Sequence, residues 1–196
     1  FLGMASGLNW NEYYEEAPFS SDVVRMLYFA SKKSVTDYVL TVPVKHKPGT
    51  RFHYSSGDTN IVMGAIQRAL PDELKQTYPW EFFFNPLDMN GTFETDAKGV
   101  FLGSSYVYLN TKDLLKLGQL IIDQGNYQGK QVVPADYIKF ALDLNSPMKD
   151  HGRCLKDHYM TYGAQFWMNH ACANGKRPFK DAPSNMVMLL GHGGQM

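Results

Sequence analysis

The sequence has few cysteines, no excess of charge and no long apolar run. Its 196 residues include two cysteines, and 19 basic residues balance 19 acidic ones. No run of Lys and Arg exceeds two residues, so the charge pattern gives no reason to expect a nucleic-acid partner. No apolar run approaches the ~20 residues of a membrane-spanning helix, so no transmembrane segment is predicted. The 44% hydrophobic content suffices for one good core or two modest lobes.

Several common catalytic patterns are also missing. There is no His-Glu-x-x-His helix, no glycine-rich phosphate loop and no Gly-x-Ser-x-Gly turn, so the corresponding hydrolase and nucleotide-binding classes lack support. A literal Ser-x-x-Lys occurs at Ser146–Lys149. Because Pro147 and polar neighbours predict a loop there, we interpret this match as chance.

The residue types of a zinc site occur between positions 151 and 172, at His151, Cys154, His158, His170 and Cys172. Their spacing matches no common zinc pattern, and the surrounding segments are predicted to be loops. A metal site, a Cys154–Cys172 disulfide and two free thiols all remain open on this pattern.

The stretch from Pro48 to Asn60 organises the chain. A Pro48-Gly49 turn leads into a short extended run ending at Tyr54, and a helix capped by Asp58 or Thr59 is predicted to follow. Apolar residues at helical spacing predict that one face of this helix is buried: Ile61, Val62, Ala65, Ile66 and Leu70. Tyr54 and Ser56 would then be fixed beside a helix N-terminus. A phenol held there can carry protons if a nearby cation lowers its pKa, although a tyrosine that only packs against the helix start is the alternative.

The remaining pattern predicts a mostly helical chain with strands near its C-terminal end. Residues 1–160 are predicted to form a helical lobe that carries the Tyr-Ser-Ser motif, including an amphipathic helix from Asn110 or Thr111 to Gly125 with a leucine-rich face. Residues 161–196 are predicted to be returning strands of an α/β lobe, with one strand at 162–169 and another at 185–190. The second strand ends at a glycine-flanked His192, where backbone N–H groups could approach a ligand; a surface turn is the alternative.

Five stretches, in this order, resemble the serine β-lactamase and penicillin-binding protein superfamily, on its class C-like branch. That branch also holds DD-peptidases, carboxylesterases and 6-aminohexanoate-dimer hydrolases. The stretches are Leu2–Leu8, similar to LL-x-M-T-S-G-L; Pro48–Ser56, similar to PG-x-x-F-x-Y-S-N/S; Pro86–Met89, similar to PLGM; Gly103–Leu117, similar to G-x-x-x-x-T-x-x-DLxKxG; and His192–Gly194, similar to Lys/His-Thr/Gly-Gly. The resemblance implies an α/β (α+β) fold of the β-lactamase/transpeptidase type, mostly the helical lobe plus a returning strand of the antiparallel sheet.

The resemblance also implies site residues. Tyr54 matches the tyrosine that exchanges protons with the nucleophile and leaving group, and Ser56 matches a position, often Asn, that contacts substrate or the catalytic lysine. His192 matches the family's basic residue on the edge strand, and Gly193 and Gly194 follow it. The backbone N–H of Gln195 matches one half of the oxyanion hole.

The resemblance implies hydrolysis of a small ester or amide through an acyl-enzyme. It implies no metal and no organic cofactor. The family's Ser-x-x-Lys helix precedes the stretch matched by Leu2–Leu8, so we expect the nucleophile upstream of this sequence and the chain by itself to be inactive. A catalytically inactive relative that binds a peptide or cell-wall ligand is the alternative. Members of the branch are often exported, which favours a periplasmic or secreted protein, and a Cys154–Cys172 disulfide would strengthen that expectation.

Overall fold

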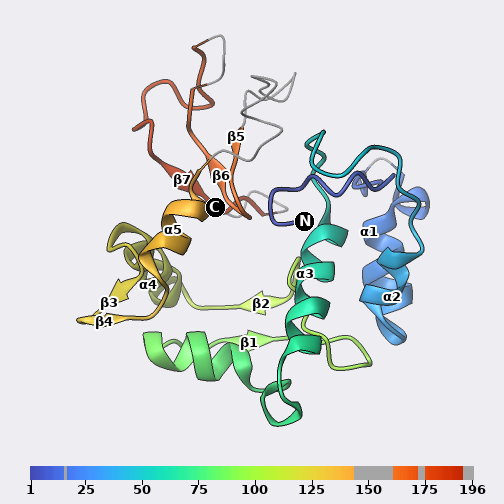
Figure 1. Ribbon diagram of the computed structural model, residues 1–196, viewed down its shortest axis with the longest axis horizontal. Helices are drawn as coiled ribbons and strands as arrows, with labels where there is room; N and C mark the ends of the chain where they lie inside the picture. The colour runs from blue at the N-terminus through green and yellow to red at the C-terminus, as the bar shows by residue number, and fades with distance from the viewer. Residues whose placement is uncertain (16, 144–160, 172–174, 192–196) are drawn as a thin grey trace.

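The computed structural model describes residues 1–15, 17–143, 161–171 and 175–191. The described residues form five α-helices and seven short strands, and α3 is the longest of these helices. In Figure 1, α1 and α2 lie on one side of α3 and α4 and α5 on the other. The helices are α1 (Asp22–Val24), α2 (Val35–Leu40), α3 (Ser56–Ala69), α4 (Thr111–Ile122) and α5 (Ala135–Ala141). Single 3-10 or π turns lie at Pro18–Ser20, Arg25–Phe29, Ala30–Lys32, Asp72–Leu74, Trp80–Phe84 and Asn85–Leu87.

The strands form three small antiparallel sheets. β1 (Thr92–Phe93) pairs with β2 (Val107–Tyr108), and β3 (Asn126–Tyr127) pairs with β4 (Lys130–Gln131). The third sheet has the order β5-β6-β7, from Thr161–Tyr162, Trp167–Met168 and Val187–Met188. The mixture of helices and antiparallel strands confirms the predicted fold class. The division at residues 160 and 161 stays a prediction.

Two predicted elements differ in detail from the structure. Helix α3 is capped by Ser55, whose Oγ accepts from the Asp58 N–H at 3.1 Å, and not by Asp58 or Thr59. The strand predicted at 162–169 is a hairpin, because the chain reverses at Gln165, where φ is +71°. The α4 prediction is confirmed, with Asn110 as its cap.

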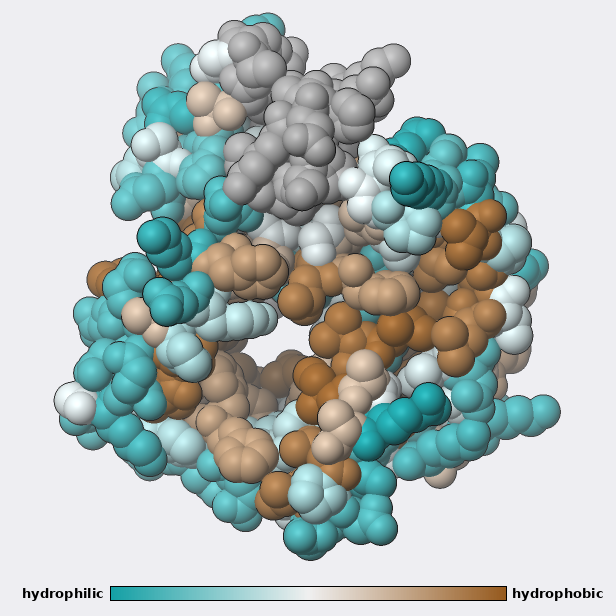
Figure 2. Space-filling model, viewed as in Figure 1, coloured by the Kyte–Doolittle hydropathy of each residue, from teal (hydrophilic) through white to brown (hydrophobic). Residues whose placement is uncertain are grey.

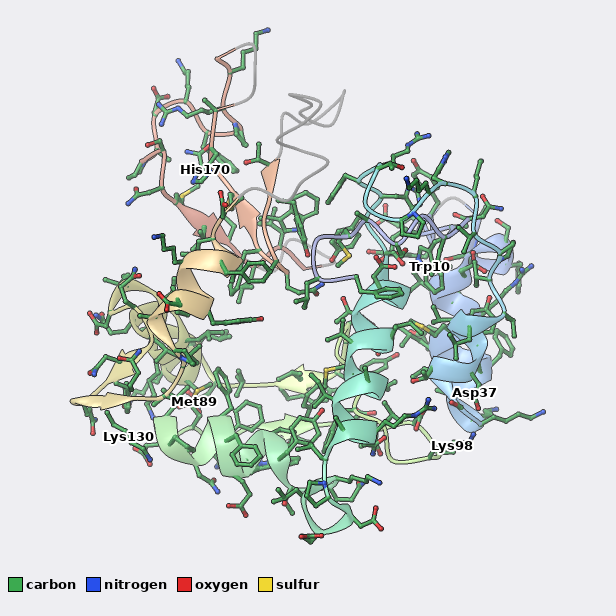
Figure 3. All side chains as sticks on the ribbon, viewed as in Figure 1. Trp10, Asp37, Met89, Lys98, Lys130 and His170 are labelled. Carbon is green, nitrogen blue, oxygen red and sulfur yellow. The ribbon has the colours of Figure 1, made fainter. Side chains whose placement is uncertain are left out.

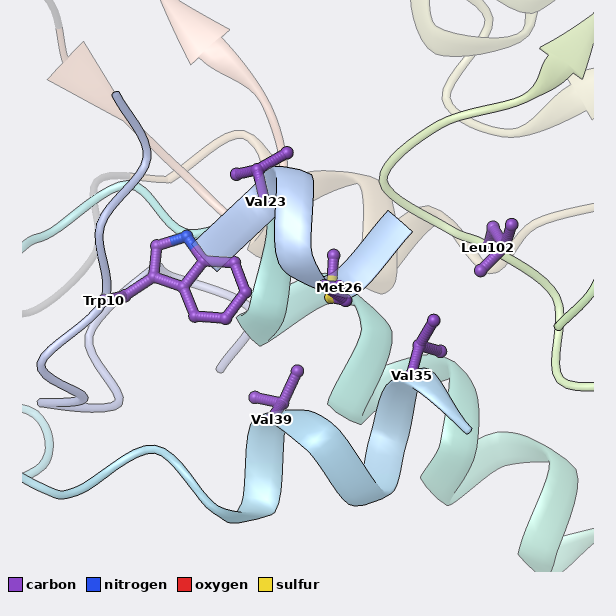
Figure 4. Packing of buried hydrophobic residues seen from close by; sticks show 6 residues of the cluster. All are labelled: Trp10, Val23, Met26, Val35, Val39 and Leu102. Carbon is purple, nitrogen blue, oxygen red and sulfur yellow. The ribbon is translucent and has the colours of Figure 1, made fainter. Parts of the chain in front are cut away.

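Two clusters of apolar side chains make up most of the core. The first lies between α1, α2 and α3, where Met26, Val35 and Val39 are fully buried; Figure 4 shows it, with Trp10, Val23 and Leu102 completing the cluster. The second surrounds α4 and consists of Phe84, Leu87, Met89 and Leu120.

The apolar faces predicted for α3 and α4 are not fully covered by the described residues. Ile66 on α3 is 38% exposed and Leu115 on α4 is 69% exposed, whereas the buried residues of α3 include the polar Asp58, Asn60 and Gln67. Figure 2 shows an opening through the middle of the molecule with a largely apolar rim. The prediction that one apolar face of α3 is buried is therefore wrong at Ile66. Among the described residues, none of the helices combines the length and apolar character that crossing a bilayer requires.

Candidate functional site

Tyr54 lies directly before the Ser55 cap of α3, half-buried in a cluster of aromatic rings. Its ring stacks on Trp167 with centroids 5.3 Å apart and meets Tyr162 edge-on at 6.0 Å. Phe52 and Met4 pack in the same cluster. Neighbours from three separate parts of the chain therefore fix the orientation of the Tyr54 ring.

The β5-β6 hairpin reaches this turn through the reversal at Gln165. The Thr59 hydroxyl of α3 donates to Gln165 Oε1 at 2.8 Å, across 106 positions of sequence. The backbone and side-chain N–H groups of Gln165 both donate to the Leu2 carbonyl at 3.1 Å. These bonds hold the hairpin, and with it Trp167, against the first turn of α3.

The N-terminal segment is attached to the same turn through Asp58. Its buried carboxylate accepts from the Ser6 hydroxyl at 2.5 Å and from the Ser6 N–H at 3.3 Å. The His53 N–H donates to the Met4 carbonyl at 2.8 Å. The segment that contains Ser6 is thus bonded to His53 and Asp58, on either side of the Tyr-Ser-Ser motif.

Ser56 is buried and bonded twice to Glu12, a residue that the sequence did not indicate. Its hydroxyl donates to Glu12 Oε1 at 2.6 Å, and its backbone N–H donates to Glu12 Oε2 at 3.0 Å. The indole N–H of Trp10, labelled in Figure 3, also donates to Oε2. Glu12 lies 44 positions from Ser56 in a segment predicted to be a loop, so no local spacing could have revealed the contact.

Burial and this carboxylate set the acid–base properties of the turn. Burial raises the pKa of Glu12 above its usual 4.5, although hydrogen bonds from Ser56 and Trp10 and the nearby His53 partly oppose the shift. Burial first, and then the charges of Glu12 and Tyr14, raise the pKa of Tyr54 to about 12. The sequence analysis made a nearby cation the condition for proton transfer by this phenol. Within the described part of the chain, the charges acting on Tyr54 are negative and raise its pKa instead.

The rest of the predicted site lies outside the described residues: His192, Gly193, Gly194 and Gln195. The strand leading to them is described, and Met188 of β7 pairs with Trp167 of β6, whose ring stacks on Tyr54. That Tyr54 and His192 belong to one site thus stays a prediction. The described strand before His192, β7, is paired with β6, which carries the Trp167 ring against Tyr54.

The metal, disulfide and chance-motif interpretations also fall mainly outside the described residues. His151, Cys154, His158 and Cys172 are among those not described, as is the Ser146–Lys149 segment. His170 is described and is labelled in Figure 3. Where the structure describes the chain, it brings no three metal-ligating side chains together.

A surface pocket of about 340 Å³ lies at the opposite end of α3 from Tyr54. It is lined by polar residues of α2, α3 and the segment before β2, including Asp37, Gln67, Arg68 and Lys98. An ion pair at 2.6 Å between Lys98 and Asp37, both labelled in Figure 3, crosses its edge. The pocket contains none of the residues predicted to act on a substrate.

Comparisons with known proteins agree with this arrangement. A model of the Beta-lactamase family matches residues 2–167. A solved structure of a proposed 6-aminohexanoate-dimer hydrolase from Bacillus anthracis is similar with a TM-score of 0.64 and 20% identity, over 89% of this chain and 47% of that one. A proposed beta-lactamase from Bacteroides dorei DSM 17855 gives 0.54 and 16%, over 72% and 47%. No curated protein matches. These structural likenesses show the fold, and the chain spans about half the length of each of the two structures.

Proposed function

Because the chain belongs to the Beta-lactamase family, we propose that it is part of a serine hydrolase that works through an acyl-enzyme. The nucleophile would come from a Ser-x-x-Lys segment that precedes Phe1 in the full-length protein. The lysine and Tyr54 would take the serine proton during acylation and return it to the leaving group. Water would then hydrolyse the acyl-enzyme.

The position of Tyr54 is the observation that carries the proposal. Its half-buried phenol belongs to a turn that is held by Ser55, Glu12 and the aromatic cluster, at the start of the longest helix. Such restraint is what a proton-transfer group needs, because its rate depends on a fixed position relative to the reacting atoms. Ser56, His192, Gly193 and Gly194 would line the site, and the Gln195 N–H would donate to the developing oxyanion.

We propose a small ester or amide as substrate in preference to a β-lactam. Ser56 and His192 stand at positions where these residues are frequent among the members that are not lactamases. One of the similar structures carries the name of a 6-aminohexanoate-dimer hydrolase, which agrees with a small substrate of that kind.

A catalytically inactive, ligand-binding relative is the second candidate, and the Ser56 contact favours it. The Ser56 hydroxyl already donates a hydrogen bond to Glu12, and the pKa of the Tyr54 phenol is raised to about 12. A phenol with that pKa is a poor proton acceptor at neutral pH unless a cation lies beside it.

Labelling of the full-length protein with a fluorophosphonate probe tests the two candidates. The hydrolase predicts a covalent adduct on one serine, located by peptide mass spectrometry and lost when that serine is changed to Ala. A folded full-length protein that forms no adduct and hydrolyses no p-nitrophenyl ester would favour the ligand-binding candidate.

A further inference from the structure

Glu12 is a carboxylate with three hydrogen-bond donors, and among the described residues no cationic group lies within salt-bridge distance of it. Two of the donors belong to Ser56 and the third to Trp10, and all are neutral groups. No described salt bridge includes Glu12. The side chain is only partly buried, so another group can still reach it.

The ionised form of Glu12 is costly where it stands. Its folded-state pKa is raised, so its contribution to stability is greatest below the ordinary 4.5 and is lost as the pH rises through the folded value. Ionising this carboxyl group in the folded protein therefore lowers the stability of the fold. A carboxyl group whose charge is disfavoured in this way, and which is bonded to Ser56 two positions after a candidate proton carrier, is typical of functional sites.

We propose that Glu12 is a positioning residue that holds an ammonium group against the Tyr54 phenol. This inference rests on the proposed hydrolase function and deepens it. An ammonium there would pair with the carboxylate and favour the ionised phenol, the condition for proton exchange at Tyr54. The ammonium can belong to a lysine of the protein or to an amine on the substrate, because the chemistry of the contact is the same.

The other titratable groups around the phenol do not supply this charge. Tyr14 and Tyr162 can only add negative charge, and Asp58 is a carboxyl group bonded to Ser6. His53 acts on Glu12, but it is not among the groups whose charge acts on Tyr54, and its ring Nε2 is bonded to the Trp10 carbonyl at 2.8 Å. Glu12 is thus the carboxylate whose charge bears most directly on Tyr54, after burial itself.

Glu12→Gln in the full-length protein separates charge from geometry. The Gln oxygen can accept from the Ser56 and Trp10 N–H groups, and its NH2 can donate to the Ser56 hydroxyl, which rotates to accept. We expect Glu12→Gln to keep or raise the urea midpoint at pH 8. Glu12→Asp, which keeps the charge, should retain more activity than Glu12→Gln.

The kinetic test uses two p-nitrophenyl esters that differ only in a terminal ammonium or methyl group on the acyl chain. We expect Glu12→Gln to lower kcat/KM about tenfold or more. Equal loss on both esters identifies an ammonium of the protein, and loss on the ammonium ester alone identifies that of the substrate. Unchanged kcat/KM on both esters overturns the proposal.

A titration that needs no turnover distinguishes this inference from the proposed function. The pKa of Tyr54 is read from 13C-labelled tyrosine in the full-length protein, with Tyr54→Phe to assign the signal. If the ammonium is the protein's own, Glu12→Gln raises the pKa of Tyr54; if it comes from substrate, added tetramethylammonium, which stays charged at every pH, lowers this pKa in the wild type and not in Glu12→Gln. A fall in pKa on Glu12→Gln with no tetramethylammonium effect overturns the inference, whether or not the protein hydrolyses esters.

Discussion

The turn before α3 and the apolar cluster beside α4 are stabilised by different kinds of contact. At the turn, buried polar groups such as Ser56 and Asp58 are held by hydrogen bonds from distant segments. Beside α4, Phe84, Leu87, Met89 and Leu120 pack through apolar contact, and one more apolar side chain of the same helix, Leu115, is exposed. Directed hydrogen bonds fix positions to within a few tenths of an ångström, whereas apolar packing mainly supplies stability. The difference agrees with the proposal that the turn before α3 takes part in the chemistry.

Gly7→Ala should have the largest effect, because it disrupts the backbone support of the turn. Gly7 has φ +80°, and a Cβ there would overlap the His46 carbonyl oxygen. Strain and overpacking together should cost about 3–5 kcal/mol of unfolding free energy in urea denaturation of the full-length protein. Gly49→Ala is the matched control: φ is +79° with open space around it, so about 1–2 kcal/mol of strain is expected. Equal costs for the two would mean that the close approach to His46 is unimportant.

Leu120→Ala tests the apolar region. Leu120 is 1% exposed, so its truncation should leave a cavity and cost about 2–5 kcal/mol in the same assay. Leu115→Ala on the same helix should cost less than about 0.5 kcal/mol, because the side chain is 69% exposed. A loss at Leu115 as large as that at Leu120 would show that further residues of the full-length protein cover this face of α4.

Tyr54→Phe tests whether the turn is built for chemistry. The ring can keep its stacking on Trp167, so folding should change little, while acylation should slow about 100-fold, or roughly 2.7 kcal/mol of barrier. Tyr38→Phe is the control, since that hydroxyl donates to Asp22 at 2.7 Å, in the first core cluster. Single-turnover kinetics on the full-length protein should show normal acylation for Tyr38→Phe. An equal rate for Tyr54→Phe would remove Tyr54 from the mechanism.

The same contrast explains how much the sequence could predict. The helix after Ser55 and the Asn110 cap were predictable, because caps and apolar periodicity act within a few residues. The fold class was predictable from the family resemblance of the five matched stretches. The Glu12–Ser56 and Ser6–Asp58 bonds were not, because each depends on a tertiary contact between distant segments. The exposed Ile66 and Leu115 show a second limit: periodicity indicates an apolar face but does not say which residues cover it.

Tyr78 gives the smallest predicted effect and compares the two regions at alkaline pH. Burial raises the pKa of Tyr78 to about 12, as it does for Tyr54, and its ring packs edge-on against Phe101. Between pH 10 and 12 the unfolded chain loses this phenolic proton before the folded protein does, so the stability contributed by Tyr78 falls as the pH rises. Tyr78→Phe should flatten that fall by at most about 1.4 kcal/mol per pH unit in urea denaturation.

Tyr54→Phe, measured in the same way, should flatten the alkaline fall less than Tyr78→Phe if the protein itself supplies the ammonium that Glu12 holds. Such a cation would lower the pKa of Tyr54, so Tyr54 would contribute less to the loss of stability at alkaline pH. Among the described residues, no comparable carboxylate that could hold a cation acts on Tyr78. Equal flattening by the two variants would mean that no resident cation lies beside Tyr54. The ammonium would then have to arrive with the substrate, and Tyr54 would be activated only in the complex.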